Sequence, residues 1–395
     1  MGLASKLVLA YGVQQGAGVI NQLAQNKPSP YPPAGQQQQQ QQQQGYNGAP
    51  QQGQAAQYYQ QQQPHQQSQA NYTPGYGAAP SQGYNPAYAA AGGAALGAAY
   101  AAHGAHAQPQ LTGDQNYILR VLEHCVQDQR LQAFYPPGSL QGLAQRISQS
   151  GALQRIAAEW RLPMEVAMDL AKLALFDVIL FLDDSGSMAF EENGGRIDDA
   201  KLICSRVAQA ASLFDTDGIS VLFMNSHTVG HNICSEQQAS QLISSINFSG
   251  LTPFGTSLDQ KVLQPLIVGP ARSNALRKPI LVIGVTDGEP AGEDRYTLVK
   301  AVQNCKAMLQ QTRYGPDALS LELAQVGLDM KSRAFLSEID SHPVIGGMVD
   351  VTSSFEVEQE ECIKTTGVSI SPELWLLKLI LGGISSDMDS KDERR

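Results

Sequence analysis

Charged side chains are almost absent from the beginning of this 395-residue chain. Residues 1–110 contain Lys6 and Lys27 as their only charged side chains, and all 36 acidic residues come later. Glutamine, alanine, glycine and proline fill most of this stretch, and they bring little apolar area to offset the conformational entropy that is lost on folding. We therefore expect residues 1–110 to be a disordered, low-complexity region.

The sequence also lacks long hydrophobic runs and closely spaced cysteines. No stretch of about 18 uncharged apolar residues occurs, so no transmembrane segment is predicted. The five cysteines are far apart in the sequence and odd in number, which is typical of reduced thiols rather than of a disulfide framework. Both features favour a cytoplasmic protein, with the nucleus as the alternative location.

Tyrosine is concentrated in the part of the chain that lacks charge. Nine of the fourteen tyrosines lie within residues 28–110, spaced by polar residues, and an unbroken glutamine run occupies residues 36–44. Tyrosine and glutamine arranged in this way are typical of segments that associate with one another through aromatic and amide contacts. We expect self-association through residues 28–110.

Residues 111–174 carry apolar side chains at helical spacing and predict a small all-α domain. A helix-turn-helix that reads DNA could be drawn over residues 156–173, but basic and acidic side chains are balanced in this domain. The whole chain is acidic, with a formal net charge of −10, which disfavours a nucleic-acid backbone as its partner. We expect these helices to pack against the following domain, and we expect no nucleic-acid partner.

From residue 176 onward, short apolar runs alternate with helical patterns, which is typical of a parallel sheet covered on both faces. The fold class predicted for residues 175–363 is α/β, a doubly wound, mostly parallel, Rossmann-like sheet with ligand-binding loops at the carboxyl ends of its strands. A C-terminal helical extension is expected at residues 364–384 and a disordered tail at residues 385–395. Strands are expected at residues 178–182, 219–224, 279–285, 319–326 and 347–351. Helices are expected at residues 196–214, 236–246, 257–266, 296–311 and 331–339.

Oxygen-bearing side chains follow the first predicted strand directly. Asp183, Ser185 and Ser187 occupy alternate positions, and Gly186 lets the loop between them curl so that their oxygens can converge on one point. Carboxylate and hydroxyl oxygens suit hard cations such as Mg²⁺ and Mn²⁺, and they offer nothing to a soft metal. The sequence therefore predicts a cation site at this strand end.

This arrangement resembles the metal-ion-dependent adhesion site of von Willebrand factor A domains, of the intracellular type. The resemblance covers roughly residues 175–360, and its specificity comes from the order, spacing and strand context of three separate motif parts. It matches Thr256, at the start of a predicted helix, to the threonine of the motif, and Asp287, after the central strand, to the closing aspartate. The resemblance implies that Mg²⁺, or else Mn²⁺ or Ca²⁺, is held by Asp183, Ser185, Ser187, Thr256 and Asp287.

In this family, an acidic side chain of a partner protein fills an open coordination position of the cation. Because three of the five protein ligands are neutral hydroxyls, the cation keeps much of its charge and attracts that carboxylate. The resemblance therefore implies a divalent-cation-dependent protein–protein interaction module in an intracellular adaptor. The rim that selects the partner is expected to include Asp184, Phe254, Glu289 and Pro290.

Two alternative functions compete with this interpretation. In the first, the protein is a condensate or assembly scaffold driven by residues 28–110, and the α/β domain recruits its clients. In the second, it is a metal-dependent phosphatase, but an Asp-x-Asp motif would need a carboxylate at Ser185, or at Gly186 if the motif began at Asp184. No GxxxxGK[ST], HExxH or GxSxG motif occurs, so the protein is predicted not to be an enzyme.

Two further patterns have simpler explanations. His227, His231 and Cys234 have a spacing that could hint at zinc, but no fourth ligand is in view, and a solvated edge strand is the favoured interpretation. Thr252 competes with Thr256 for the threonine position of the motif, but it precedes a proline and comes before the helix begins.

Overall fold

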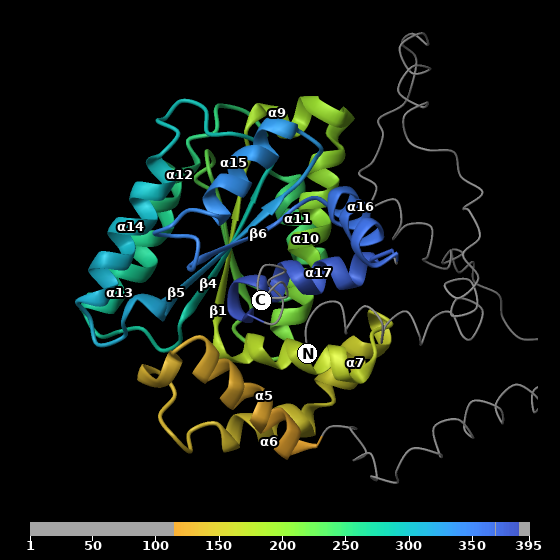
Figure 1. Cartoon of the computed structure of the whole chain (residues 1–395), viewed down its shortest axis with the longest axis vertical. Coiled ribbons are helices and arrows are strands. Elements are labelled where there is room, and N and C mark those ends of the chain that lie inside the picture. Colours follow the sequence, from red (N-terminus) through yellow and green to blue (C-terminus); the bar gives the residue numbers. More distant parts are fainter. Residues whose placement is uncertain (1–113, 368, 387–395) are drawn as a thin grey trace, which may run out of the picture. The chain divides into compact units, whose positions relative to one another are not determined.

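The computed structural model describes residues 114–367 and 369–386. Its centre is a six-stranded sheet with the order β3-β2-β1-β4-β5-β6 (Figure 1). Neighbouring strands run parallel except for β3, which is antiparallel to β2 at one edge. The expected α/β class with a mostly parallel sheet is thereby confirmed. The strands are β1 (Asp177–Leu182), β2 (Ile219–Phe223), β3 (Val229–Ile233), β4 (Ile280–Thr286), β5 (Leu319–Gln325) and β6 (Val349–Thr352).

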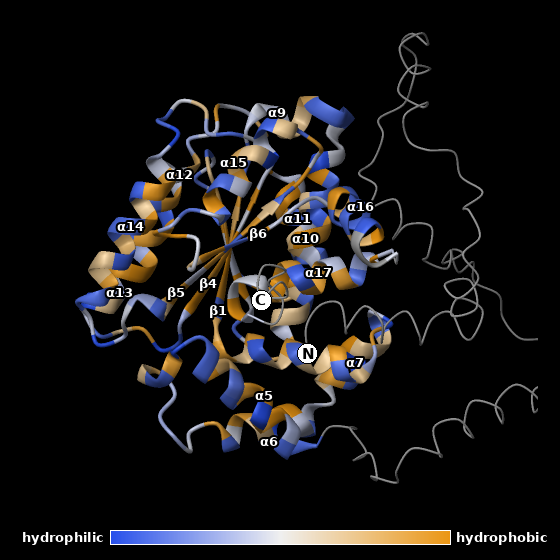
Figure 2. Cartoon of the chain, in the orientation of Figure 1, coloured by the Kyte–Doolittle hydropathy of each residue, from blue (hydrophilic) through white to orange (hydrophobic). Residues whose placement is uncertain are grey.

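The central strands are buried on both sides, which explains their continuous apolar sequences. All residues of β4 and β5 are buried. In β1, Leu180 and Leu182 pack into the core on one face of the sheet, while Ile179 and Phe181 pack into the core on the other. The two faces of the central strands therefore serve two separate hydrophobic cores, and Figure 2 shows the apolar residues concentrated along the strands.

Helices cover both faces of the sheet. On one face, α10, α11 and α17 contribute to the first core; on the other, α12, α14 and α15 contribute to the second. A π-helix continues α12 and contains a proline, whose missing N–H interrupts the regular bonding pattern. The helices on these faces are α9 (Gly186–Phe190), α10 (Gly195–Ser212), α11 (Glu236–Ser244), α12 (Phe254–Leu258), the π-helix η7 (Asp259–Val268), α13 (Gly269–Arg272), α14 (Thr297–Gln310), α15 (Met330–Asp340), α16 (Phe355–Thr366) and α17 (Pro372–Leu381), with short 3-10 turns η6 (Glu191–Gly194), η8 (Pro316–Ala318) and η9 (Gly382–Ile384).

The helices that precede the sheet share its first core. Ile118, Leu153 and Trp160 belong to the same buried cluster as apolar residues of α10 and α17. Residues on both sides of position 174 therefore build one hydrophobic core, and the expected packing of these helices against the sheet is observed. The segments are α5 (Gln115–Asp128), η4 (Leu131–Ala133), α6 (Gln141–Ser150), α7 (Ala152–Glu159), α8 (Met164–Ala167) and η5 (Met168–Leu175).

Helix α17 is buried along its whole length. Ser371 caps its start by accepting the Leu374 N–H, and Pro372 occupies the first turn, where its missing N–H costs nothing. Among the described residues, no helix is long and apolar enough to cross a membrane. The expectations for residues 1–110 and for most of the C-terminal tail lie outside the residues described.

Gly255 provides a test of the packing between α12 and α14. A Cβ at this position would lie 2.7 Å from the Leu298 Cα, which is backbone and cannot move aside. We expect Gly255→Ala to lower the free energy of unfolding by about 1–3 kcal/mol, measured by urea denaturation. The matched control is Gly142→Ala in α6, where a Cβ meets only the end of Arg146 and the substitution should leave stability unchanged or raise it by up to about 1 kcal/mol. Equal stabilities of wild type and Gly255→Ala would contradict this close approach.

Candidate functional site

Asp183 is fixed at the point where β1 ends. Its N–H donates to the Val285 carbonyl at 2.9 Å, which continues the pairing of β1 with β4. Its carboxylate accepts the Ser185 N–H at 2.9 Å and the Thr286 hydroxyl at 2.7 Å. The side chain is 1% exposed. Strand β4 and the first residues of its own loop therefore hold this carboxylate at the edge of the sheet that carries α9, α12 and α15 (Figure 1).

A chain of hydrogen bonds joins the two serines to the aspartate that follows β4. The Ser185 and Ser187 hydroxyls lie 3.0 Å apart, and the Ser187 hydroxyl donates to Asp287 Oδ1 at 3.0 Å. The Asp287 main-chain carbonyl accepts the Ser332 hydroxyl at 2.9 Å. Four of the five predicted ligands therefore lie together at the carboxyl ends of β1 and β4. They are Asp183, Ser185, Ser187 and Asp287.

Thr256, the fifth predicted ligand, is bonded to a different carboxylate. Its N–H and its hydroxyl donate to Glu293 at 2.8 and 2.6 Å, and the Gly255 N–H donates to the other Glu293 oxygen at 2.8 Å. Glu293 thus neutralises the first turn of α12, where unpaired N–H groups favour a negative charge. Sequence reasoning missed Glu293, because its partners lie 37 and 38 positions away in the chain.

The loop that leads to Thr256 is tied to the other two loops of the site. The Gly186 N–H donates to the Gly250 carbonyl at 3.2 Å. Thr252 exchanges two backbone hydrogen bonds with Ala291, at 3.1 and 3.0 Å. These contacts hold the three loops against one another, and they give Thr252 a role in loop pairing.

Arg196 is the main site residue that the sequence did not indicate. Its Nη1 lies 2.6 Å from Asp287 Oδ2, and its other nitrogens contact Glu191 and Glu192 at 2.6 and 3.1 Å. The side chain is buried, and Gly327, with φ +77°, passes so close that a Cβ there would lie 2.8 Å from Glu192 Oε1. An isolated arginine in an amphipathic helix carries no pattern that would single it out before the fold is known.

Burial and mutual repulsion dominate the electrostatics of the two aspartates. Burial, and next the charge of Asp287, raise the pKa of Asp183 to about 6. Burial also raises the pKa of Asp287, while its hydrogen bond and ion pair with Arg196 work in the opposite direction. A single guanidinium therefore leaves one buried carboxylate of this pair without a compensating charge.

The donor set fits a hard cation. Two carboxylates and the hydroxyls of Ser185, Ser187 and Thr256 offer oxygen atoms alone, which is the ligand chemistry of Mg²⁺, Mn²⁺ and Ca²⁺. Within residues 114–367 and 369–386, no group of three or more His, Cys, Asp or Glu side chains is placed to hold a metal. A cation at this edge would therefore depend on the hydroxyl oxygens as well as on the carboxylates.

The zinc alternative is not favoured by the geometry. His227 and His231 are exposed on and beside β3, which forms one edge of the sheet. The Cys234 thiol instead contacts the carbonyls of Thr216 and Asn232. The interpretation as a solvated edge strand agrees with this arrangement.

The expected rim is wrong for two of its four residues, because their side chains point inward. Asp184 is 1% exposed and accepts the N–H groups of Asn225 and Ser226 at 2.6 and 2.7 Å, which anchors the turn after β2. Phe254 is 4% exposed and packs edge-on against Phe181 with ring centroids 5.2 Å apart. The other two expected rim residues, Glu289 and Pro290, are half-buried.

No family model matches the chain, and no curated protein is significantly similar to it.

The raised pKa of Asp183 predicts a pH-dependent effect of Asp183→Asn. Because the folded-state pKa of about 6 lies above the ordinary aspartate value of 3.8, charging this group costs stability as the pH rises through that interval. In EDTA at pH 7, we expect Asp183→Asn to be more stable than wild type by up to roughly 3 kcal/mol, and the difference should shrink towards pH 4. Urea denaturation at both pH values measures it. A difference independent of pH would contradict the assignment of the cost to this carboxylate.

The Arg196–Asp287 pair predicts a strong coupling between these side chains. Arg196→Met leaves a buried carboxylate without its partner, and we expect a loss of about 3 kcal/mol in the free energy of unfolding. In the double variant with Asp287→Asn, most of that loss should be recovered, as a double-mutant cycle in EDTA would show. Arg206→Met on the same helix breaks a more exposed pair with Glu236 and should cost about 1 kcal/mol or less. Equal losses for the two arginines would show that burial of the pair has no effect.

Proposed function

We propose that the α/β domain is a divalent-cation-dependent protein–protein interaction module of the von Willebrand factor A type. In this proposal, an acidic side chain of a partner protein completes the coordination of the cation. The observation behind it is the hydrogen-bonded chain from Ser185 through Ser187 to Asp287, beside the buried carboxylate of Asp183. The cation, Mg²⁺ or else Mn²⁺ or Ca²⁺, would be held by Asp183, Ser185, Ser187, Thr256 and Asp287.

The charge balance of the site supports a cation. Asp183 and Asp287 repel each other in a buried setting, and Arg196 compensates the second of them. Arg196 occupies Oδ2 of Asp287, so Oδ1 and the serine hydroxyls are the oxygens nearest to a cation site. A cation that meets mostly neutral hydroxyls stays electropositive, and this favours a carboxylate as its exogenous ligand.

The hydrogen bond of Thr256 to Glu293 is compatible with a ligand role. A hydroxyl that donates its proton keeps its lone pairs, and these can face a cation. Glu293 would then orient the threonine oxygen and increase its electron density, as carboxylates do for other metal ligands. Thr256 and Glu293 are therefore proposed to act as a ligand and the residue that positions it.

Exposed apolar side chains near the site support a protein as the partner. Phe190 is 83% exposed at the end of α9, and its ring lies beside Gly186 in the first loop. Leu251 is 61% exposed in the second loop, next to Gly250. Leu328 follows β5 and donates its N–H to Glu192, close to Arg196. Apolar residues gathered at one edge mark interaction surfaces, and we assign the rim to them together with Glu289 and Pro290.

We infer a non-enzymatic role because the residues beside Asp183 lack the groups that phosphoryl transfer would need. The position two residues after Asp183 is Ser185, whose hydroxyl lies beside Ser187, so no second carboxylate is available there as an acid or base. We place this activity in a cytoplasmic adaptor, with the nucleus as the alternative. The acidic net charge of −10 argues against nucleic acid as the partner.

A scaffold driven by residues 28–110 is the second candidate function. It is favoured by the tyrosines and the glutamine run of that segment. Deleting residues 1–110 separates the two functions: the interaction module predicts that Mg²⁺-dependent partner binding persists, whereas the scaffold predicts that the cellular activity is lost.

Cation binding is tested with Mn²⁺ and the full chain by electron paramagnetic resonance. We expect one bound Mn²⁺ per chain, with affinity reduced about tenfold or more by Asp183→Ala and by Ser187→Ala. Asp217→Ala, an exposed carboxylate before β2, should retain the wild-type affinity. Absence of a bound Mn²⁺ at millimolar concentration would refute the cation site.

Partner binding is tested by affinity capture from cell extract with wild type and Asp183→Ala, each in Mg²⁺ and in EDTA. We expect that some proteins are recovered with wild type in Mg²⁺ and in none of the other three arms. If Mn²⁺ binds but the same proteins appear in all four arms, the cation is structural and has no part in recognition.

A further inference from the structure

Four exposed apolar side chains lie on the loops of the proposed cation site. Their exposed fractions range from 49% to 83%, so they contribute little to either hydrophobic core, and stability does not account for their placement. Apolar side chains that cluster in this way are typical of a surface that binds another protein. We call them the apolar rim, and its members are Phe190, Leu251, Leu328 and Met330.

Two members of the apolar rim border the first and second loops of the site. A ring carbon of Phe190 and the Gly250 carbonyl oxygen lie 3.6 and 3.7 Å from the position that a Cβ of Gly186 would occupy. Leu251 follows Gly250 directly, and its carbonyl accepts the side-chain N–H of Asn225 at 3.0 Å, which fixes the second loop. These two apolar side chains therefore border the loop that carries the serine hydroxyls.

The other two members border the aspartate that follows β4. The Leu328 N–H donates at 3.0 Å to Glu192, whose carboxylate also accepts from the guanidinium bound to Asp287. Met330 begins α15, and the Ser332 hydroxyl in the same turn donates to the Asp287 carbonyl at 2.9 Å. The apolar rim thus extends from the serine loop to the aspartate loop, with the proposed cation site between them.

Two exposed glutamates lie beside members of the apolar rim. Glu191 directly follows Phe190, and Glu192 accepts the Leu328 N–H; their side chains are 55% and 36% exposed. A partner with several carboxylates would meet these glutamates, and like charges side by side weaken binding. The surface therefore favours one carboxylate at the cation with uncharged neighbours around it.

The low-complexity region of the chain cannot supply that carboxylate. Residues 1–110 contain no aspartate and no glutamate. Self-association through residues 28–110 would therefore leave the cation site free for a different protein.

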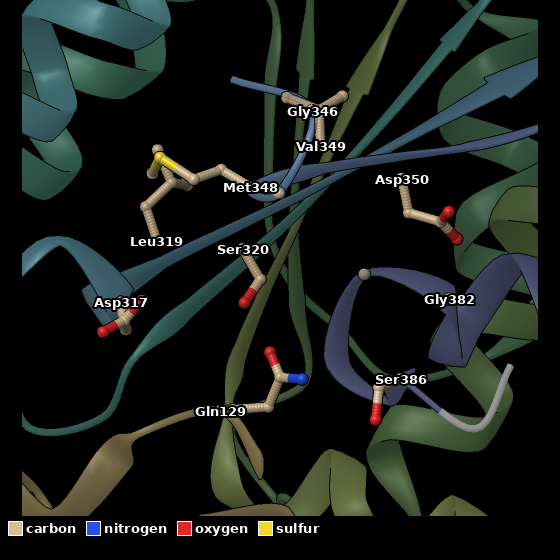
Figure 3. A pocket seen from close by; sticks show the side chains of 12 residues that line it. Gln129, Asp317, Leu319, Ser320, Gly346, Met348, Val349, Asp350, Gly382 and Ser386 are labelled. Carbon is tan, nitrogen blue, oxygen red and sulfur yellow. The ribbon is translucent and has the colours of Figure 1, made fainter. Parts of the chain in front are cut away.

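The pocket at the other end of the sheet is not part of this surface. It has a volume of about 200 Å³, opens where β5 and β6 begin, and includes Gln129, Asp317 and Gly346 in its lining (Figure 3). No member of the apolar rim lines it. A side chain that entered this pocket would be at the wrong end of the strands to reach the cation.

We propose that the partner presents a single acidic residue with large aliphatic or aromatic side chains within about three positions on both sides, a reach of about 10 Å in an extended segment. The carboxylate binds the cation, and the apolar neighbours pack against Phe190 and Leu251 and against Leu328 and Met330. This inference rests on the proposed function, and it adds the local sequence that the partner must carry.

Selection from a display library of random dodecapeptides on the full chain tests the proposal, with one arm in Mg²⁺ and one in EDTA. We expect the peptides enriched in the Mg²⁺ arm alone to share one Asp or Glu with apolar residues on both sides. The most enriched peptide is then synthesised, and its affinity is measured by fluorescence anisotropy. Exchange of its acidic residue for the amide should abolish Mg²⁺-dependent binding, and exchange of an apolar neighbour for serine should weaken it about tenfold.

Substitutions in the chain assign the binding to the apolar rim. Phe190→Ser and Met330→Ser each remove an exposed apolar side chain and should weaken binding of the selected peptide about tenfold. Ile363→Ser is the matched control, because Ile363 is 48% exposed on α16, outside the loops of the site, and it should retain the wild-type affinity. Mn²⁺ titration of each variant distinguishes a lost apolar contact from a lost cation.

Mn²⁺ titration of wild type separates failure of this inference from failure of the proposed function. Absence of bound Mn²⁺ would overturn the cation site and the partner sequence with it. Bound Mn²⁺ without Mg²⁺-dependent enrichment of peptides, with enrichment of acidic clusters, or with unchanged peptide affinity in both rim variants would overturn the partner sequence alone.

Discussion

The repulsion between two buried aspartates, at the ends of adjacent parallel strands, is the interaction on which the rest of the carboxyl edge of the sheet depends. Asp183 follows β1 and Asp287 follows β4, and the register between these strands leaves the two carboxylates close enough to repel each other. Water cannot screen them, because each side chain is 1% exposed. The Thr286 hydroxyl donates to Asp183, and the Ser187 hydroxyl and the Arg196 guanidinium donate to Asp287.

The sheet makes this arrangement possible by supplying rigid supports on both sides. Leu182 and Val285, the strand residues before the two loops, are buried and paired in register. The two loops are joined by the hydrogen bond from Ser187 to Asp287, and Asp183 and Asp287 directly follow their strands, so these two carboxylates stand on strand ends. Precise placement of oxygen atoms, which a hard cation requires, follows from that rigidity.

The sequence predicted the elements that have a hydrophobic period or a local motif. It did not predict the side-chain contacts between residues that are far apart in the chain. Each expected strand lies within two residues of its observed bounds, because five apolar runs and their turns are local signals. Asp184 was expected at the rim, yet it faces inward and holds Asn225, 41 positions away. Arg196 meets Asp287 across 91 positions, and Thr256 meets Glu293 across 37. Such pairings depend on the completed fold and leave no trace in residue spacing.

The burial of α17 has a consequence for synthesis of the protein. Its ten residues are made after the whole sheet, yet their apolar side chains fill the core between that sheet and the helices that precede it. Until this segment has emerged, the apolar side chains of the first core lack the contacts that α17 makes with them. Exposed apolar surface makes incomplete chains prone to aggregation, so a chaperone should shield this core until α17 has emerged.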